Sequence, residues 1–505
     1  MNQAQPKVQL WVFFLHSVSR VIILFLVPEH NLSYQIHQFI QEFTQIMQQK
    51  IKHTNDFGND PIPSLVLRLS VPFMFAQFVN VLYSIVDRIY IGNIPGSGSV
   101  ALAGAGVCAP IITLLSSFGT LVGIGGSILF SMRLGQDNKR QARLILGNCF
   151  SVLLIFSAVL TLVFLLTKGY LLSWFGASQT TYPYADTYLT IYTCGTFFAL
   201  LSIGMNYFIT AQGFPLLGMA TTLIGAVLNI LLDPLFIFVF HMNIAGAAAA
   251  TVLSQLASCV FVLLVLLRKR MPIRLCLLRP DGRLLGQIMG LGFSPFLILA
   301  TDSIIIIAMN AALQYHGGPG YGDTLITCAT IVQSYMMLIT SPMLGITGGS
   351  QPLISFNLGA GKQDRICRII RCVLLLCICF TSVMFLLSRI LPSAFARIFT
   401  GNPEYIQLSV WGIRVFTMMI IPLSLQYTFV DSLTALGMTK LSLTLSLFRK
   451  TLYLLAACLL PFAFDPSGSF YAEPVADGTG AFLSTAVYLF IYFKYLRKPG
   501  SLQSI

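Results

Sequence analysis

Residues 70–93, SVPFMFAQFVNVLYSIVDRIYIGN, are apolar over a length sufficient to cross a lipid bilayer, and they carry a single carboxylate, Asp87. Pro72, which interrupts helical hydrogen bonding, lies fifteen positions before it. A charged side chain at the bilayer centre costs on the order of 3 kcal/mol, so a chain that keeps one generally uses it to hold an ion, a proton or a cationic ligand. Asp87 is therefore a candidate functional residue. The alternative is an acid that reaches water at the helix end or pairs with Arg88.

The whole chain has the composition of a protein that crosses the membrane many times. Of its 505 residues, 56% are hydrophobic and 9% are charged, and the mean hydropathy is +0.80. The net charge of +13 is therefore expected in loops on one membrane face and does not indicate a nucleic-acid partner. The 11 cysteines and 6 histidines are isolated, so we predict no metal site of that kind and no cofactor. There is no Walker A loop, so ATP is not expected to be the direct energy source.

Twelve membrane-spanning helices are predicted from residue 64 onward, which gives an all-α polytopic membrane protein. Their approximate bounds are 64–92, 100–132, 143–167, 183–210, 215–240, 245–267, 284–315, 323–357, 366–390, 402–435, 441–464 and 477–495. An even number of spans requires that both termini lie on the same side of the membrane.

Basic residues concentrate in alternate connections of this topology. Eighteen follow even-numbered spans or lie at the C-terminal end: Arg133, Lys139, Arg140, Arg143, Arg268, Lys269, Arg270, Arg274, Arg279, Arg283, Lys362, Arg365, Arg368, Arg371, Lys440, Lys494, Arg497 and Lys498. The opposite face has three basic residues, and its last loop is predicted to hold only acids. These are Lys168, Arg389 and Arg397, and then Asp465, Glu473 and Asp477. The positive-inside rule thus predicts a multi-pass protein of the cell membrane with both termini in the cytoplasm.

The two halves of the chain repeat one another at an offset of 223 or 224 residues. Pro72 aligns with Pro295, and Ala211-Gln-Gly213 aligns with Ala435-Leu-Gly437. Each half then holds six spans of the same topology, related by an axis along the membrane normal, as in many secondary transporters. The predicted domains are an N-terminal extension, 1–46; a cytoplasmic lead, 47–63; a first six-helix bundle, 64–267; a basic linker, 268–283; a second six-helix bundle, 284–498; and a tail, 499–505.

The extension 1–46 does not match the rest of the chain. Its apolar stretch 10–27 is interrupted by His16 and Arg20, and residues 34–51 are amphipathic. We expect this extension either to lie on the membrane surface or to be dispensable, with Met47 as the real start of a fully active chain.

The halves differ in their acidic residues. Asp87 aligns with Asn310. Asn229 and Asp233 lie four residues apart, on one face of the fifth span, and their counterparts in the second half are a tyrosine and an alanine. With the Thr251 hydroxyl, these groups make an oxygen-rich cluster suited to Na⁺ or a transferable proton rather than to a soft metal. The alternative for Asp233 is a helix terminus at the membrane interface.

Two further acids lie within second-half spans, Asp302 in the seventh and Asp431 in the tenth. Together with Asn310, they are candidate contacts for a cationic substrate. Either acid could instead be neutralised by a neighbouring helix.

Five segments carry a resemblance to a known family: VPFMFAQFVNVLYSIVDRIYIGN, SMRLGQDNKRQAR, NILLDPLFIF, AGAAAATVLSQ and GITGGSQPLISFNLGAGKQDR. Over residues 56–498 the chain resembles the multidrug and toxic compound extrusion family of antiporters, in the branch of staphylococcal multidrug pumps and DinF-like proteins. The resemblance implies a cation site formed by Asp87, Asn229, Asp233 and Thr251. It also implies that Pro72 bends its helix when the occupancy of this site changes.

The resemblance further implies that Na⁺ or H⁺ entry drives export of small organic cations by alternating access. The expected partners are these small molecules and membrane lipid, and we expect a monomer. A lipid-linked glycan flippase of the same superfamily is an alternative, which the mainly acidic in-span charges disfavour. A membrane-embedded enzyme is a third alternative. It would need a cluster of catalytic groups, and the sequence offers none beyond the set around Asp87.

Overall fold

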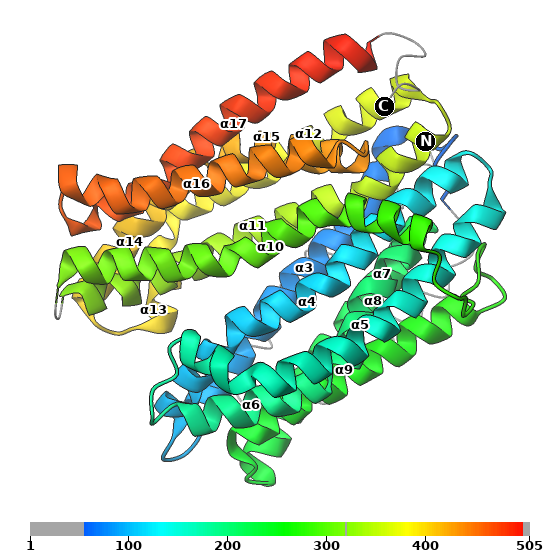
Figure 1. Cartoon of the computed structure of the whole chain (residues 1–505). Coiled ribbons are helices and arrows are strands. Elements are labelled where there is room, and N and C mark those ends of the chain that lie inside the picture. Colours follow the sequence, from blue (N-terminus) through cyan, green and yellow to red (C-terminus); the bar gives the residue numbers. More distant parts are fainter. Residues whose placement is uncertain (1–54, 319–320, 498–505) are drawn as a thin grey trace, which may run out of the picture. The chain divides into compact units, whose positions relative to one another are not determined.

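The computed structural model describes residues 55–318 and 321–497, and the regular elements within these ranges are all helices (Figure 1). The predictions for the extension 1–46, for the first part of the lead 47–63 and for the tail 499–505 lie outside the described residues.

The first half of the described chain contains seven α-helices and one π-helical turn. They are α3 (Ile62–Gly92), α4 (Gly98–Gly135), α5 (Lys139–Trp174), α6 (Tyr182–Cys194), α7 (Thr196–Ala211), α8 (Pro215–Pro234), η1 (Leu235–Val239) and α9 (Asn243–Leu267). The second half follows the same order with short additions. Its elements are α10 (Gly282–Gly317), α11 (Tyr321–Gly359), α12 (Gln363–Ile390), α13 (Pro392–Phe399), α14 (Pro403–Phe416), η2 (Thr417–Met419), α15 (Ile420–Ala435), α16 (Thr439–Ala463), η3 (Pro466–Tyr471), α17 (Ala472–Ile491) and η4 (Tyr492–Leu496).

The predicted fold class, an all-α protein with twelve spans in two six-helix bundles, is confirmed. In the described residues, eleven helical segments are long and apolar enough to cross a membrane, and α6 with α7 makes a twelfth that is bent by 55°. The bend falls at Gly195, where Val252 of α9 packs so closely that a Cβ would lie 2.5 Å from its side chain. Most of the observed helix bounds fall within a few residues of the predicted ones.

The internal repeat is visible in helix packing and in the turns. In the first half α3 packs on α8 and α4 on α7; in the second half α10 packs on α16 and α11 on α15. Gly213 and Gly437 occupy equivalent turns, before α8 and before α16, with φ of +90° and +82°. Residues other than glycine rarely adopt such φ values, which explains why both copies of the Ala-x-Gly sequence retain this glycine.

The two bundles contact each other through α3 and α4 of the first half and α10 and α11 of the second (Figure 1). Glycines let the backbones approach closely there. A Cβ added at Gly292 would lie 1.8 Å from the carbonyl oxygen of Leu121, and one at Gly135 would lie 2.0 Å from that of Phe356. These contacts lie near the end of the bundles that carries the α4–α5, α9–α10 and α11–α12 connections, which we call the basic end. We call the opposite end the far end.

A short segment, the strap, formed by residues 55–60, closes the basic end further. The side-chain amide of Asn55 donates to the carbonyl of Gly213 in the first half (2.8 Å). From the second half, Arg365 donates to the carbonyls of Phe57 (3.2 Å) and Asp60 (2.9 Å). Lys362 donates to the carbonyl of Gly58 (2.9 Å). The strap therefore links the two bundles, through a side chain toward the first half and through main-chain carbonyls toward the second.

The glycine contacts give a prediction with a matched control on the same helix. Gly292→Ala should destabilise the closed basic end, because its Cβ would collide with the α4 backbone. Gly290→Ala should leave stability unchanged or raise it, because nothing lies within 4 Å of a Cβ there and alanine favours the helix by about 1 kcal/mol. Thermal unfolding of the purified proteins measures both effects. Equal unfolding temperatures for the two variants would contradict the close approach of α4 and α10.

Candidate functional site

Four predicted site residues come together in the first bundle, which we call the first-bundle cluster: Asp87 on α3, Asn229 and Asp233 on α8, and Thr251 on α9. The Asn229 amide nitrogen lies 3.3 Å from Asp233 Oδ1 and 3.3 Å from Thr251 Oγ1. The Asp87 carboxyl lies within hydrogen-bonding range of the Asp233 carboxyl. Three helices thus direct carboxyl, amide and hydroxyl groups to one place.

The first-bundle cluster is buried at α8 and half-buried at Asp87 and Thr251, and no basic side chain pairs with its acids. Asp233 is 0% exposed and Asn229 is 1% exposed. Three of its oxygens have no hydrogen-bond partner in the described chain, namely Asp87 Oδ1, Asn229 Oδ1 and Asp233 Oδ2. Each unsatisfied buried group costs about 1–3 kcal/mol, and more when it is charged. Arg88 is exposed, and the ion pairs of the described residues include none at Asp87 or Asp233. The oxygens therefore fit a proton or a small hard cation.

Local helix geometry explains how Asp233 is held inside the bundle. Pro234 follows it but does not end the helix, because the chain continues as the π-helical turn η1 to Val239. Such turns inside helices are frequent at functional sites. Asp233 is therefore followed by further helical residues and is not the last residue of its helical segment.

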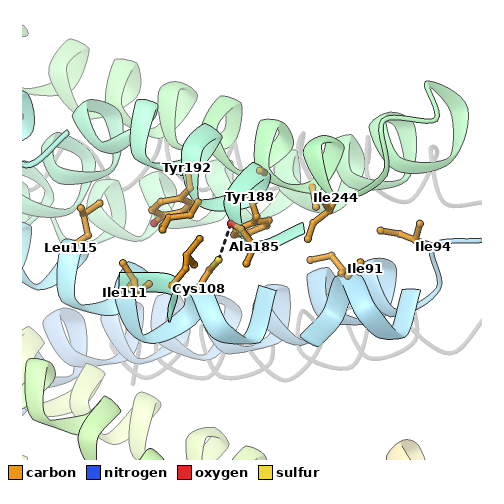
Figure 2. Packing of buried hydrophobic residues seen from close by; sticks show 14 of the residues in the cluster. Ile91, Ile94, Cys108, Ile111, Leu115, Ala185, Tyr188, Tyr192 and Ile244 are labelled. Carbon is orange, nitrogen blue, oxygen red and sulfur yellow. Dashed lines mark hydrogen bonds between the residues drawn. The ribbon is translucent and has the colours of Figure 1, made fainter. Parts of the chain in front are cut away.

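Two tyrosines that the sequence did not single out support the first-bundle cluster. Tyr188 and Tyr192 of α6 stack with their ring centroids 6.5 Å apart, and the Tyr188 hydroxyl interacts with Thr251. Tyr192 accepts a hydrogen bond of 3.0 Å from Gln255 of α9. Figure 2 shows both rings in a buried cluster with Cys108, whose thiol donates to the Ala185 carbonyl at 3.3 Å. Their four-residue spacing on one helix face was the available sequence signal.

Pro72 lies within α3, on the part of the helix that packs against the second bundle. Ser70, two residues before Pro72, donates to the carbonyl of Ile346 at 2.9 Å. Met74, two residues after Pro72, lies so close to α11 that a Cβ added at Gly345 would be 2.5 Å from its Cα. Fifteen helical residues separate Pro72 from Asp87, about 22 Å at 1.5 Å per residue. One helix therefore joins the first-bundle cluster to the contact between bundles.

The candidate substrate contacts of the second half do not form one group. Asp302 of α10 pairs with Lys450 of α16, with 2.7 Å between Nζ and Oδ1, so a neighbouring helix neutralises it. Asp431 of α15 interacts with the side chains of Thr347 and Gln351 on α11. Asn310, the counterpart of Asp87, is partly buried in α10.

The second bundle also contains buried charges that sequence reasoning misplaced. The prediction that Glu473 and Asp477 belong to the last far-end loop is wrong: both lie in α17. Arg449 of α16 approaches Asp477 at 3.0 Å and Glu473 at 3.7 Å. Hydropathy placed the two acids in the loop because it scores each charged residue as unfavourable in a membrane and takes no account of a basic partner on another helix. The available signal was the adjacent basic pair, Arg449 and Lys450, in the middle of the predicted span 441–464, which requires acidic partners.

Known proteins resemble this chain over nearly its whole described length. It is 23% identical over 434 residues to the multidrug export protein MepA of Staphylococcus haemolyticus, covering 85% of this chain and 93% of the relative. It is 25% identical over 376 residues to MepA of Staphylococcus saprophyticus, covering 74% and 81%. A solved structure described as the outward-facing conformation of a multidrug resistance MATE family transporter aligns with a TM-score of 0.82 at 19% identity, covering 90% of this chain and 100% of that one.

The family model points the same way, and its two matched segments follow the internal repeat. The MatE model matches residues 72–235 of the first half and 299–459 of the second. The first segment includes Pro72, Asp87, Asn229 and Asp233. The chain is a member of the MatE family.

Proposed function

We propose that this transporter exports small organic cations in exchange for Na⁺ or H⁺ that binds at the first-bundle cluster. The observation that carries the proposal is the set of three unpartnered oxygens in a buried cluster without a basic side chain. An ion or proton entering there would satisfy groups that the protein leaves unsatisfied. The staphylococcal relatives, which are multidrug export proteins, support drug export as the work done by this ion.

The proposed orientation places the basic end in the cytoplasm. The basic connections at this end support it through the positive-inside rule. In this orientation, the glycine contacts and the strap close the cytoplasmic side, so that substrate leaves toward the far end. The likeness to a transporter described as outward-facing is consistent with this state.

Coupling is proposed to run along α3. Without a bound cation or proton, the carboxylates of Asp87 and Asp233 repel one another across a medium of low dielectric constant. A proton or cation between them removes the repulsion and draws α3 toward α8. Because the part of α3 around Pro72 packs against α11, a shift of α3 also changes the contact between the bundles. Ion binding in one bundle then alters closure of the basic end.

Inverted membrane vesicles that contain the protein test this proposal directly. A Na⁺ gradient and a pH gradient are imposed separately, and transport of a cationic fluorescent dye is measured by its fluorescence. We expect one of the two gradients to drive transport and vesicles without the protein to show none. Transport that is indifferent to both gradients would refute ion coupling.

Substitutions at the first-bundle cluster should abolish coupled efflux. Asp87→Asn and Asp233→Asn preserve volume and remove a charge. We expect efflux to fall by about tenfold or more, because each 1.4 kcal/mol of lost ion-binding free energy is a factor of ten. Asn310→Asp, at the equivalent position in the second bundle, is the matched control and should cost far less. Efflux is compared at equal expression in the membrane. Equal sensitivity at Asp87 and Asn310 would show that the ion site is not confined to the first bundle.

Pro72→Ala should slow turnover more than it weakens substrate binding. A proline inside a helix removes one backbone hydrogen bond and costs about 3 kcal/mol, which neighbouring helices can absorb. Restoring that bond stiffens α3 beside the bundle contact and should favour one of the two states. Dye affinity and efflux rate are measured on the same purified variant. If both remain at wild-type values, Pro72 has only a packing role.

A further inference from the structure

The Lys450 ammonium group lies in an oxygen cage formed by a single turn of α10. Its three N–H groups face Asp302 Oδ1 at 2.7 Å, Thr301 Oγ1 at 2.8 Å and the carbonyl oxygen of Ile298. Carboxylate, hydroxyl and carbonyl oxygens are the groups that recognise a primary ammonium ion, which has three donors and no acceptor. The second bundle therefore holds a complete ammonium-binding turn, occupied by the protein's own side chain.

The two partners of this ion pair differ in accessibility. The Asp302 side chain is 49% exposed, whereas that of Lys450 is 9% exposed. Asp302 also lies near the middle of α10, which spans Gly282–Gly317, so its exposed surface is far from either helix end. An incoming molecule can therefore contact the carboxylate before Lys450 has moved.

Two further acids of the second bundle, Glu473 and Asp477, lie on α17. The neighbouring acids Glu473 and Asp477 share one basic partner, Arg449, and Asp477 Oδ2 has no hydrogen-bond partner in the described chain. Counting Asp302, the group contains three acids and two bases. When all three acids are ionised, one negative charge is left without a basic partner of its own, and this charge attracts a displaced ammonium.

We propose that the α10 turn of Ile298, Thr301 and Asp302 binds the charged amine of the exported substrate, and that Lys450 is a tethered competitor for this turn. This inference rests on the proposed export of organic cations and names the amine class within it. When substrate is absent, Lys450 occupies the turn and keeps Asp302 paired. When an amine arrives, it exchanges with Lys450, which turns toward Glu473 and Asp477.

The competition makes a prediction of unusual sign: removing a positive charge strengthens binding of a cation. Lys450→Met keeps the length of the side chain and removes the competitor, so we expect the dissociation constant of dansylcadaverine, a fluorescent primary amine, to fall about tenfold. Asp302→Asn removes the carboxylate and should raise that constant about tenfold. Lys440→Met, at an exposed position near the start of α16, is the control and should bind the amine as the wild type does.

Fluorescence titration of the purified full chain in detergent provides the measurement, with N-acetylated dansylcadaverine as a neutral comparison. The neutral compound should bind all variants alike. If Lys450→Met alone fails to fold because it leaves Asp302 unpaired, the double variant Asp302→Asn with Lys450→Met removes both charges and provides a folded protein for the titration. It should bind the amine more weakly than Lys450→Met does, because the carboxylate is missing.

Three results would overturn the inference. They are unchanged or weaker amine binding by folded Lys450→Met, equal gains for the amine and its acetylated form, and amine binding by the double variant as tight as that by Lys450→Met. If these occur while Asp87→Asn still abolishes efflux, ion-coupled export stands and only the competition at Lys450 fails. Absence of amine binding by the wild type and every variant would count against both the competition and the proposed substrate class.

Discussion

A charge buried in an apolar bundle must be neutralised, and the two halves of this protein meet that requirement in opposite ways. In the first half, Asp87 and Asp233 face each other without a basic side chain, and oxygens around them lack partners. In the second half, Arg449 and Lys450 supply cations from within the chain. The repeated backbone thus carries one bundle with buried acids that lack a basic partner and one whose buried charges are nearly balanced by its own side chains.

Helix α3 connects the first-bundle cluster with the second bundle. The helix carries Asp87 in one part and, about four turns away, the surface around Pro72 that packs against α11. One helix therefore connects the first-bundle cluster with the contact between bundles, and no further element is needed to join them. The strap 55–60 adds hydrogen bonds from the second bundle to the chain just before α3, so the start of the same helix is tied to the basic end.

The sequence predicted the spans from local patterns of apolar length and from the repeat offset. It predicted the first-bundle cluster from the four-residue spacing of Asn229 and Asp233, the difference between the two halves and the family resemblance. It failed where the outcome depends on partners in distant helices. Glu473 and Asp477 resemble loop residues until Arg449 is placed beside them. The pairing of Lys450 with Asp302, 148 positions earlier, likewise follows only from the packing of α10 on α16.

The glycines at the bundle contact have a mechanical consequence. Where Gly292 and Gly135 meet carbonyl groups of the facing helices, main chain touches main chain, and no side chains of these residues interlock. Surfaces of this kind can roll over one another without any rotamer change, so the work of separation there is mainly lost dispersion contact, about 0.1–0.2 kcal/mol per atom pair. The same smoothness leaves no room for even one extra methyl group. The contact therefore tolerates substitution poorly, and sequence variation has more freedom elsewhere in the bundles.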